Sequence, residues 1–134
     1  MSLRHPKAEA WEDRLRAVFA RIDIELEREF GSRFPLHPAR PRHGATAHPD
    51  SDGLFSLGAA FTAGFGSRRG AGYVVDVRIA TLRPVPAALR REIEARAIAR
   101  LKEDLPGAFP RRKLDVVPDG DAWKIVGDLG LGNA

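Results

Sequence analysis

A glycine-rich segment, Gly64 to Gly70, is the first part of this sequence whose residue types and spacing suggest chemistry. Glycines spaced G-x-G-x-x-x-G can bring backbone N–H groups close to a phosphate. The dinucleotide-binding motif is one residue shorter, however, and both it and the phosphate loop of nucleotide hydrolases lead into a helix N-terminus. Here a strand-like alternation follows, and no lysine comes after the last glycine. We therefore interpret the glycines as a hairpin turn and predict no nucleotide cofactor.

Three of the four histidines, His37, His43 and His48, fall in one proline-rich stretch, with Asp50 and Asp52 close by. Imidazole and carboxylate groups bind zinc, but metal-binding histidines normally sit at fixed spacings on rigid elements. The spacings here are six and five residues, and prolines interrupt them. We attribute these side chains to the polarity of a loop and predict no metal site.

Side chains that could do acid–base or nucleophilic catalysis are few. The absence of cysteine excludes disulfides and thiol catalysis, and there is no G-x-S-x-G motif for an activated serine. Asp76 and Arg78 share one face of an expected strand, and Asp115, Lys124 and Asp128 are candidates for the matching face of another hairpin. An acid–base pair in a cleft could transfer a proton, but scattered charges are common on an outward sheet face. The sequence identifies no catalytic residue and leans against an enzyme.

The composition is that of an ordinary globular domain. The chain has 134 residues, of which 43% are hydrophobic and 30% charged, so residues 1–134 can form one domain with its own core. No apolar run approaches the roughly 18 residues that a membrane-spanning helix needs, and the N-terminus has no signal-peptide core. We expect a bacterial-type cytoplasmic protein without a membrane segment.

The net charge of +4 is unevenly distributed, because residues 54–113 carry twelve basic and five acidic side chains. Basic patches attract phosphate groups, so nucleic-acid binding is an alternative function. Its candidate residues are Arg68, Arg69, Arg90, Arg91, Arg96 and Arg100. Most aromatic residues fit the core, which leaves few for the stacking of single-stranded bases. A protein partner is therefore favoured over nucleic acid.

Two segments have the three- and four-residue apolar spacing of amphipathic helices. The first covers residues 7–30, and its apolar stripe consists of Trp11, Leu15, Val18, Phe19, Ile22, Leu26 and Phe30. The second covers residues 86–105 and is expected to end before Pro106-Gly107. Between the first helix and the strands, residues 31–53 contain four prolines. We predict that they form an ordered strap over the sheet, with disorder as the alternative.

Residues 54–82 are predicted to form a long hairpin, because side chains alternate between two faces on both sides of the glycine turn. One face is apolar: Phe55, Leu57, Ala59, Phe61, Ala63 and Phe65, with Tyr73, Val75, Val77 and Ile79. A shorter hairpin, residues 113–129, contains the Asp119-Gly120 pair favoured in two-residue turns. That turn would place Val116 opposite Trp123, and Leu114 opposite Ile125.

The order helix, hairpin, helix, hairpin predicts an α+β fold, in which a four-stranded antiparallel sheet carries both helices on one face. The other face of the first hairpin is unusually small. Glycine inside a strand often marks close approach by a ligand or another backbone, and exposed strands usually carry larger side chains. We expect the strap or a second subunit to cover this face. The candidate partner-binding residues are Ser56, Gly58, Ala60, Thr62, Gly64, Arg68, Arg69, Asp76 and Arg78.

These patterns favour a non-catalytic binding or assembly module that uses the sheet face and the strap, as a homodimer or with another protein. Nucleic-acid binding is the first alternative. The second is a small enzyme with a pocket between the strap and the sheet.

Overall fold

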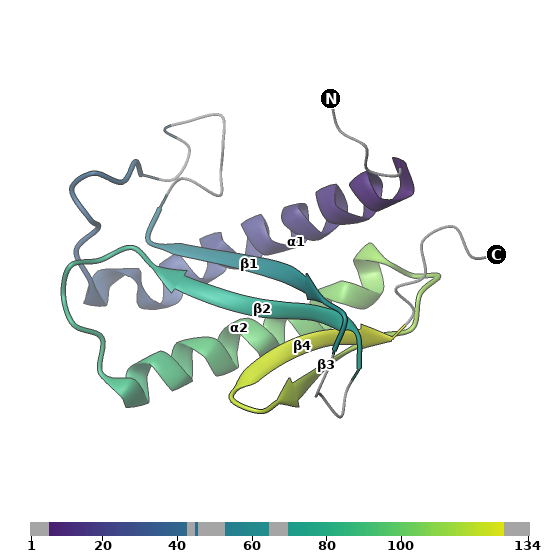
Figure 1. Ribbon diagram of the computed structural model, residues 1–134. Coiled ribbons are helices and arrows are strands. Elements are labelled where there is room, and N and C mark those ends of the chain that lie inside the picture. The colour runs from purple at the N-terminus through teal and green to yellow at the C-terminus, as the bar shows by residue number, and fades with distance from the viewer. Residues whose placement is uncertain (1–5, 43–44, 46–52, 65–69, 128–134) are drawn as a thin grey trace.

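The computed structural model describes residues 6–42, 45, 53–64 and 70–127. Its elements are α1 (Pro6–Phe30), the short 3-10 helix η1 (Gly31–Arg33), β1 (Phe55–Thr62), β2 (Gly72–Ile79), α2 (Ala87–Ala108), β3 (Leu114–Asp119) and β4 (Ala122–Gly127). The strands form one antiparallel sheet in the order β1-β2-β4-β3. Both helices lie behind this sheet, on the same face (Figure 1). The predicted α+β fold is confirmed.

The hydrophobic core lies between the two helices and the inner face of the sheet. It contains the whole predicted stripe of α1, from Trp11 to Phe30, and the inward residues of α2 from Ile93 to Leu105. The strands contribute alternate residues, among them Phe55, Leu57, Tyr73, Val75, Val77, Val116 and Ile125. Periodicity of burial therefore accounts for both the helices and the strands.

Ion pairs join the two helices. The Arg100 guanidinium lies 2.8 Å from a carboxylate oxygen of Glu25 and 3.3 Å from one of Glu29. Arg96 lies 3.1 Å from the other oxygen of Glu29. These contacts link α1 to α2 and involve two of the arginines that the sequence suggested for nucleic-acid binding.

Helix α2 ends later than predicted, because it continues through Pro106 to Ala108. Proline lacks the N–H group that would continue the helix ladder, which is why the sequence suggested a stop. The extra turn closes with the Phe109 N–H donating to the Leu105 carbonyl at 2.8 Å. Phe109 is buried against Trp11, with ring centroids 4.3 Å apart. We attribute the extension to the burial of this ring.

The register predicted for the second hairpin is wrong by two residues. Val116 pairs with Ile125, Pro118 pairs with Trp123, and Leu114 pairs with Gly127. The turn residues are Gly120 and Asp121 rather than Asp119 and Gly120, and Gly120 has a φ of 63°. Glycine at the first central position matches a type II′ turn. Because the shift is an even number, every side chain stays on its predicted face.

The described part of the strap follows the end of the first hairpin and does not lie over its small-residue face. The His37 N–H donates to the Ala80 carbonyl at 2.8 Å, and the Gly53 N–H donates to the Pro41 carbonyl at 2.7 Å. Phe34 is buried in the core. For these residues the expected covering of the sheet by the strap is wrong, since their hydrogen bonds hold them beyond the last residue of β2.

Candidate functional site

The two edges of the sheet differ in how they resist pairing with another chain. Natural edge strands often carry charges or proline, which hinder the addition of a further strand. Strand β3, at one edge, has the sequence LDVVPD, with two aspartates and a proline. Strand β1, at the other edge, has the sequence FSLGAAFT, with no charge and no proline. The β1 edge is thus the one suited to accept an extended segment.

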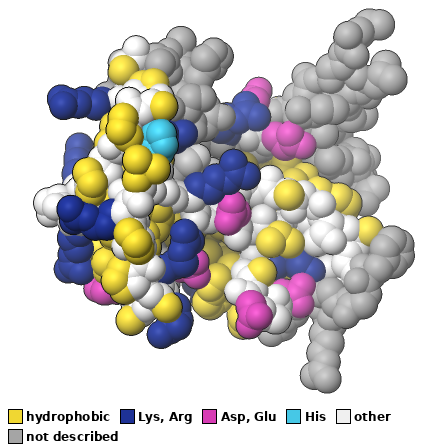
Figure 2. Space-filling view, turned by 60° about the vertical axis from the view of Figure 1, so that its left-hand side comes forward, with side chains coloured by type: hydrophobic (Ala, Val, Ile, Leu, Met, Phe, Trp, Pro, Cys, Tyr) yellow, Lys and Arg dark blue, Asp and Glu magenta, His cyan; other side chains and the backbone are white. Residues whose placement is uncertain are grey.

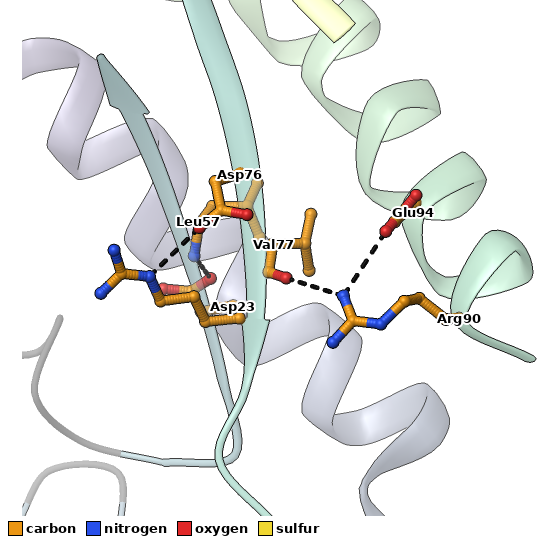
Figure 3. Close-up of polar contacts among 7 residues, drawn as sticks. Asp23, Leu57, Asp76, Val77, Arg90 and Glu94 are labelled. Atoms are coloured by element: carbon orange, nitrogen blue, oxygen red, sulfur yellow. Dashed lines mark hydrogen bonds and ion pairs between the residues drawn. The ribbon is translucent and has the colours of Figure 1, made fainter. Parts of the chain in front are cut away.

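Two contacts establish which backbone groups of the first hairpin point away from its own ladder. The Leu57 N–H donates to Oδ1 of Asp23 at 2.8 Å, and the Val77 carbonyl accepts a hydrogen bond from Nη1 of Arg90 at 3.3 Å. Figure 3 shows Asp23 and Arg90 approaching the hairpin from α1 and α2. In an antiparallel ladder, alternate residues direct both backbone groups to the same side. The backbone N–H and C=O groups of the odd-numbered residues of β1 therefore point away from β2, toward the open edge. Those of the even-numbered residues bond to β2.

Carboxylates of α1 cover the first half of the β1 edge. Asp23 is only 2% exposed and bonds to the Leu57 N–H, while Glu27 accepts a hydrogen bond from the Leu54 N–H at 3.1 Å. Among the residues that the structure describes, none occupies the outward backbone groups of Ala59 and Phe61. The open part of the edge is therefore short and lies in the second half of β1.

A groove runs between this open edge and α1. One hollow, of about 260 Å³, is lined by Glu12, Leu15, Arg16, Phe19, Leu57, Gly58, Ala59, Phe61 and Tyr73. A second hollow, of about 300 Å³, shares Arg16, Phe19 and Leu57 with the first and extends to Asp13 and Asp23. The lining combines buried apolar side chains with the exposed charged side chains of Asp13 and Arg16 and the buried carboxylate of Asp23.

Phe61 departs from the sequence prediction. The alternation places it on the inner side, but its side chain is 61% exposed. Its ring contacts Tyr73 edge-on, with centroids 5.6 Å apart. The space between this ring and α1 is the groove rather than packed core. Phe61 is consequently a large apolar side chain on the surface, next to the open edge.

The small-residue face of β1 is open in the described part of the molecule. A Cβ atom built on Gly58 would have no heavy atom within 4 Å, and Ala60 is exposed. A shallow hollow of about 440 Å³ extends from these residues to Asp76 and Arg78. Those two exposed side chains form an ion pair of 3.1 Å. Figure 2 shows basic side chains spread over this side of the molecule, with acidic and uncharged side chains between them.

Of the other predicted binding residues, Ser56 and Thr62 are half-buried on this face. The Thr62 hydroxyl accepts a hydrogen bond from the Gly64 N–H at 3.2 Å. Gly64 has a φ of 83°, as the turn requires. Arg68 and Arg69 lie outside the described residues. The structure therefore brings Ser56, Gly58, Ala60, Thr62, Asp76 and Arg78 onto one surface.

Lys124 is buried and bonded within the fold, whereas the sequence suggested that it lies on an exposed face of the sheet. It is 1% exposed, and its Nζ lies 2.5 Å from Oδ2 of Asp119 and donates to the Gly70 carbonyl at 2.8 Å. Its stem passes over Gly72, where an added Cβ would come within 2.7 Å of Lys124 Cγ and Cδ. Lys124 thus ties β4 to β3 and to the start of β2. The Asp115 carboxylate accepts from the neighbouring Val116 N–H at 2.8 Å, and Asp128 lies outside the described residues.

Four of the arginines proposed for nucleic-acid binding lie in the described part of the chain, and these four do not form a single free patch. Arg96 and Arg100 pair with glutamates of α1, and Arg90 bonds to Val77 and lies 3.5 Å from Glu94. Arg91 is exposed. The described arginines therefore act largely within the fold.

The strap holds a shallow hollow of about 370 Å³, lined by His37, Ala39, Arg40, Pro41, Ile79, Ala80 and Thr81. His37 uses its Nδ1 to accept the Ala39 N–H at 3.0 Å. His43 and His48 lie outside the described residues, and within the described ones no three potential metal ligands come together. No helix in the described ranges is both long and apolar enough to cross a membrane.

Sequence reasoning missed Asp23, Glu27 and the edge position of β1. Asp23 did carry a signal, because it lies four residues after Phe19 and three before Leu26, on the apolar stripe of α1. A carboxylate on such a stripe requires a buried donor. The strand order was the missing information, since the donor that Asp23 uses is an outward N–H group of the edge strand β1.

Comparisons with known proteins give a family relationship. A family model described as "Uncharacterised protein" matches residues 6–127. An "Uncharacterized protein" of Borreliella burgdorferi is 42% identical over 106 residues, which cover 79% of this chain and 83% of that protein. No solved structure matches the chain significantly. The chain therefore belongs to the family of uncharacterised proteins that this model represents.

Proposed function

We propose that this protein is a non-catalytic binding or assembly module of the cytoplasm, which takes up a protein partner along the second half of β1. One observation carries the proposal. An uncharged edge strand presents the backbone groups of Ala59 and Phe61 beside an apolar groove. Extended segments bind such edges by adding a strand, and pockets for alternate side chains supply the specificity.

The surroundings of the edge suit an added strand on both faces. On the inner side, an incoming side chain would enter the groove over Leu15 and Phe19. On the outer side, Gly58 and Ala60 leave room for the next side chain. Alternating residues of one extended segment would thus meet a pocket and a flat small-residue face in turn.

The charged groups at this surface support binding rather than catalysis. Asp76 and Arg78 are exposed and pair with each other on an open face. General acid–base catalysis needs its groups held near a reacting atom from which water is partly excluded. A flat, solvent-exposed ion pair does not provide that setting.

The experiment is site-specific photo-crosslinking in the cells that produce the protein. A photoreactive residue at position 60 is compared with one at Glu103, which is exposed on α2. We expect covalent protein adducts from position 60 and few from position 103, with the partner identified by mass spectrometry. Equal labelling at both positions, or none at position 60, would contradict the proposal.

A blocking variant tests the role of the edge. Ala59→Pro removes an N–H that points away from β2, so the β1–β2 ladder keeps its own hydrogen bonds. We expect the crosslinks from position 60 to disappear while circular dichroism and the melting temperature stay close to those of the parent protein. Crosslinks that persist in folded Ala59→Pro would show that the backbone edge is not the binding element.

A further inference from the structure

We propose that the partner at the β1 edge is a second copy of this chain. The two β1 strands pair antiparallel around a twofold axis at Ala60, so that Ala59 of each copy lies opposite Phe61 of the other. This inference rests on the proposed function and names the partner of that same site.

The backbone restricts the register. Only odd-numbered residues of β1 direct their N–H and C=O groups outward, so a twofold pairing must match odd residues with odd residues. The Leu57 N–H is already bonded to Asp23. The residues of β1 whose outward groups remain available are Ala59 and Phe61. When Ala59 of one copy pairs with Phe61 of the other, both residues of both copies are used. Because each such pair exchanges two bonds, the interface gains on the order of four backbone hydrogen bonds.

The side chains fit the same register. Phe61 is a 61% exposed aromatic residue whose ring contacts Tyr73 along one edge and otherwise faces solvent. Opposite it in the pair would lie Ala59 of the other copy, a small residue next to the groove formed by Leu15 and Phe19. The large side chain of one copy therefore covers the hollow of the other, and the twofold repeats the contact. On the outer face Ala60 meets Ala60, and Gly58 meets Thr62, so no large side chains collide.

The charges at the rim of the groove favour a twofold arrangement. Helix α1 carries Glu12 and Asp13 on one side of Arg16 along its axis; all three line the groove, and Arg16 pairs with Asp13 of its own helix at 3.1 Å. A twofold axis reverses this order in the second helix. The acidic end of one rim can then approach the basic position of the other, which favours complementary over like-charge contacts.

The surface is self-complementary, and this distinguishes a second copy from an unrelated segment. Both the exposed aromatic side chain and the hollow that accepts it lie on β1 and its neighbouring helix. Pairing would produce one continuous sheet with the helices of both copies on the same face, because odd residues stay on the inner side. The second half of β1, unlike the proline-containing β3 edge, carries neither charge nor proline to oppose this pairing.

Single-cysteine crosslinking tests both the partner and the register, since the native chain has no cysteine to interfere. Ala60→Cys places two thiols opposite each other at the axis, in a non-hydrogen-bonded pair whose Cα atoms lie about 4.5 Å apart. Gly58→Cys and Thr62→Cys are matched controls on the same face. In the proposed register each control thiol is about 13 Å from its symmetry mate, which is four residues along the strand.

We expect mild oxidation to convert Ala60→Cys largely to a disulfide-linked dimer, with much less dimer from either control. We also expect light scattering to give twice the mass of the chain for the parent protein and the mass of one chain for folded Ala59→Pro. Preferential crosslinking of Gly58→Cys or Thr62→Cys would overturn the register. A parent protein that stays monomeric at high concentration would overturn the second copy as partner.

The two proposals fail in different ways. Photo-crosslinking from position 60 to a different protein, with no self-crosslink of Ala60→Cys, would refute self-pairing and leave the binding function standing. An absence of any adduct at position 60 would remove both.

Discussion

The Asp23 carboxylate accepts a hydrogen bond of 2.8 Å from the Leu57 N–H, so a helix side chain closes a strand edge from within the same chain. Arg90 of α2 does the corresponding task on the opposite side of the hairpin, where it donates to the Val77 carbonyl (Figure 3). The two helices thus bond to backbone groups that have no partner strand. The Leu57 N–H lies on the edge of the sheet, and the Val77 carbonyl lies beyond the end of the β2–β4 pairing. What they leave open is the stretch from Ala59 to Phe61.

Replacing Asp23 tests how much this closure contributes to stability. Asp23→Ala leaves the buried Leu57 N–H without its acceptor, and we expect the free energy of unfolding to fall by about 1–3 kcal/mol. Asp23→Asn keeps a carbonyl oxygen in reach and should lose less. Urea denaturation of both variants provides the measurement. An alanine variant as stable as the asparagine variant would show that the hydrogen bond contributes nothing.

Lys124 and Asp119 allow a similar test of a buried charge. Asp119→Asn removes the carboxylate charge beside the buried ammonium group, which keeps its hydrogen bond to the Gly70 carbonyl, whereas Lys124→Met removes the ammonium charge itself. Breaking a buried pair costs about 3–5 kcal/mol, and exposure of the Asp119 side chain reduces the expected loss to about 2 kcal/mol. We expect Lys124→Met to be the more stable of the two in chemical denaturation. The reverse order would mean that the ammonium group stabilises the fold through its other hydrogen bonds even without the Asp119 carboxylate.

The glycines of the first hairpin provide a matched pair of substitutions. Gly72→Ala would put a Cβ within 2.6 Å of the Ile125 carbonyl oxygen, and we expect it to lower stability by about 1–3 kcal/mol. Gly58→Ala meets open space and should be neutral or stabilise by up to about 1 kcal/mol. Melting temperatures of the two variants check this contrast. A comparable loss in both would indicate that Gly58 is covered in solution.

Gly58 and Gly72 also show how far the sequence could be read. Gly58 belongs to a recognisable strand pattern, because burial imposes a period of two on a strand, as it imposes three- and four-residue spacing on a helix. The sequence assigns Gly72 to the glycine-rich turn, whereas the structure makes it the first residue of β2. Their different surroundings follow from the order β1-β2-β4-β3, which puts Gly58 beside an edge and Gly72 beside Lys124. Strand order depends on contacts between distant segments, which no local pattern records. The turn error at Gly120 has a different origin, since Asp119-Gly120 and Gly120-Asp121 both suit a two-residue turn.

Arg100 tests whether the helix-to-helix ion pairs stabilise the fold. It bonds to Glu25 and Glu29 and is partly buried. We expect Arg100→Gln to lower the free energy of unfolding by about 0.5–1 kcal/mol, with a smaller effect at high salt because screening weakens the parent pairs. A double-mutant cycle with Glu25→Gln isolates the coupling between the two side chains. Additive effects in that cycle would show that Glu25 contributes no coupling to Arg100.

Phe55 and Phe61 occupy the same face of the same strand, yet they should respond to truncation in opposite ways. Phe55 is fully buried, so Phe55→Ala is expected to cost about 3–5 kcal/mol of stability. Phe61 is mostly exposed and lies next to the groove, so Phe61→Ala should change the unfolding of dilute protein by less than about 1 kcal/mol. Its effect should emerge in self-association, where the apolar contact with the second copy is lost and dimer forms only at higher concentration. Denaturation at low concentration and light scattering over a concentration series separate the two quantities. If Phe61→Ala destabilises the dilute monomer as strongly as Phe55→Ala, the ring is packed within its own chain and is not the contact that a second copy covers.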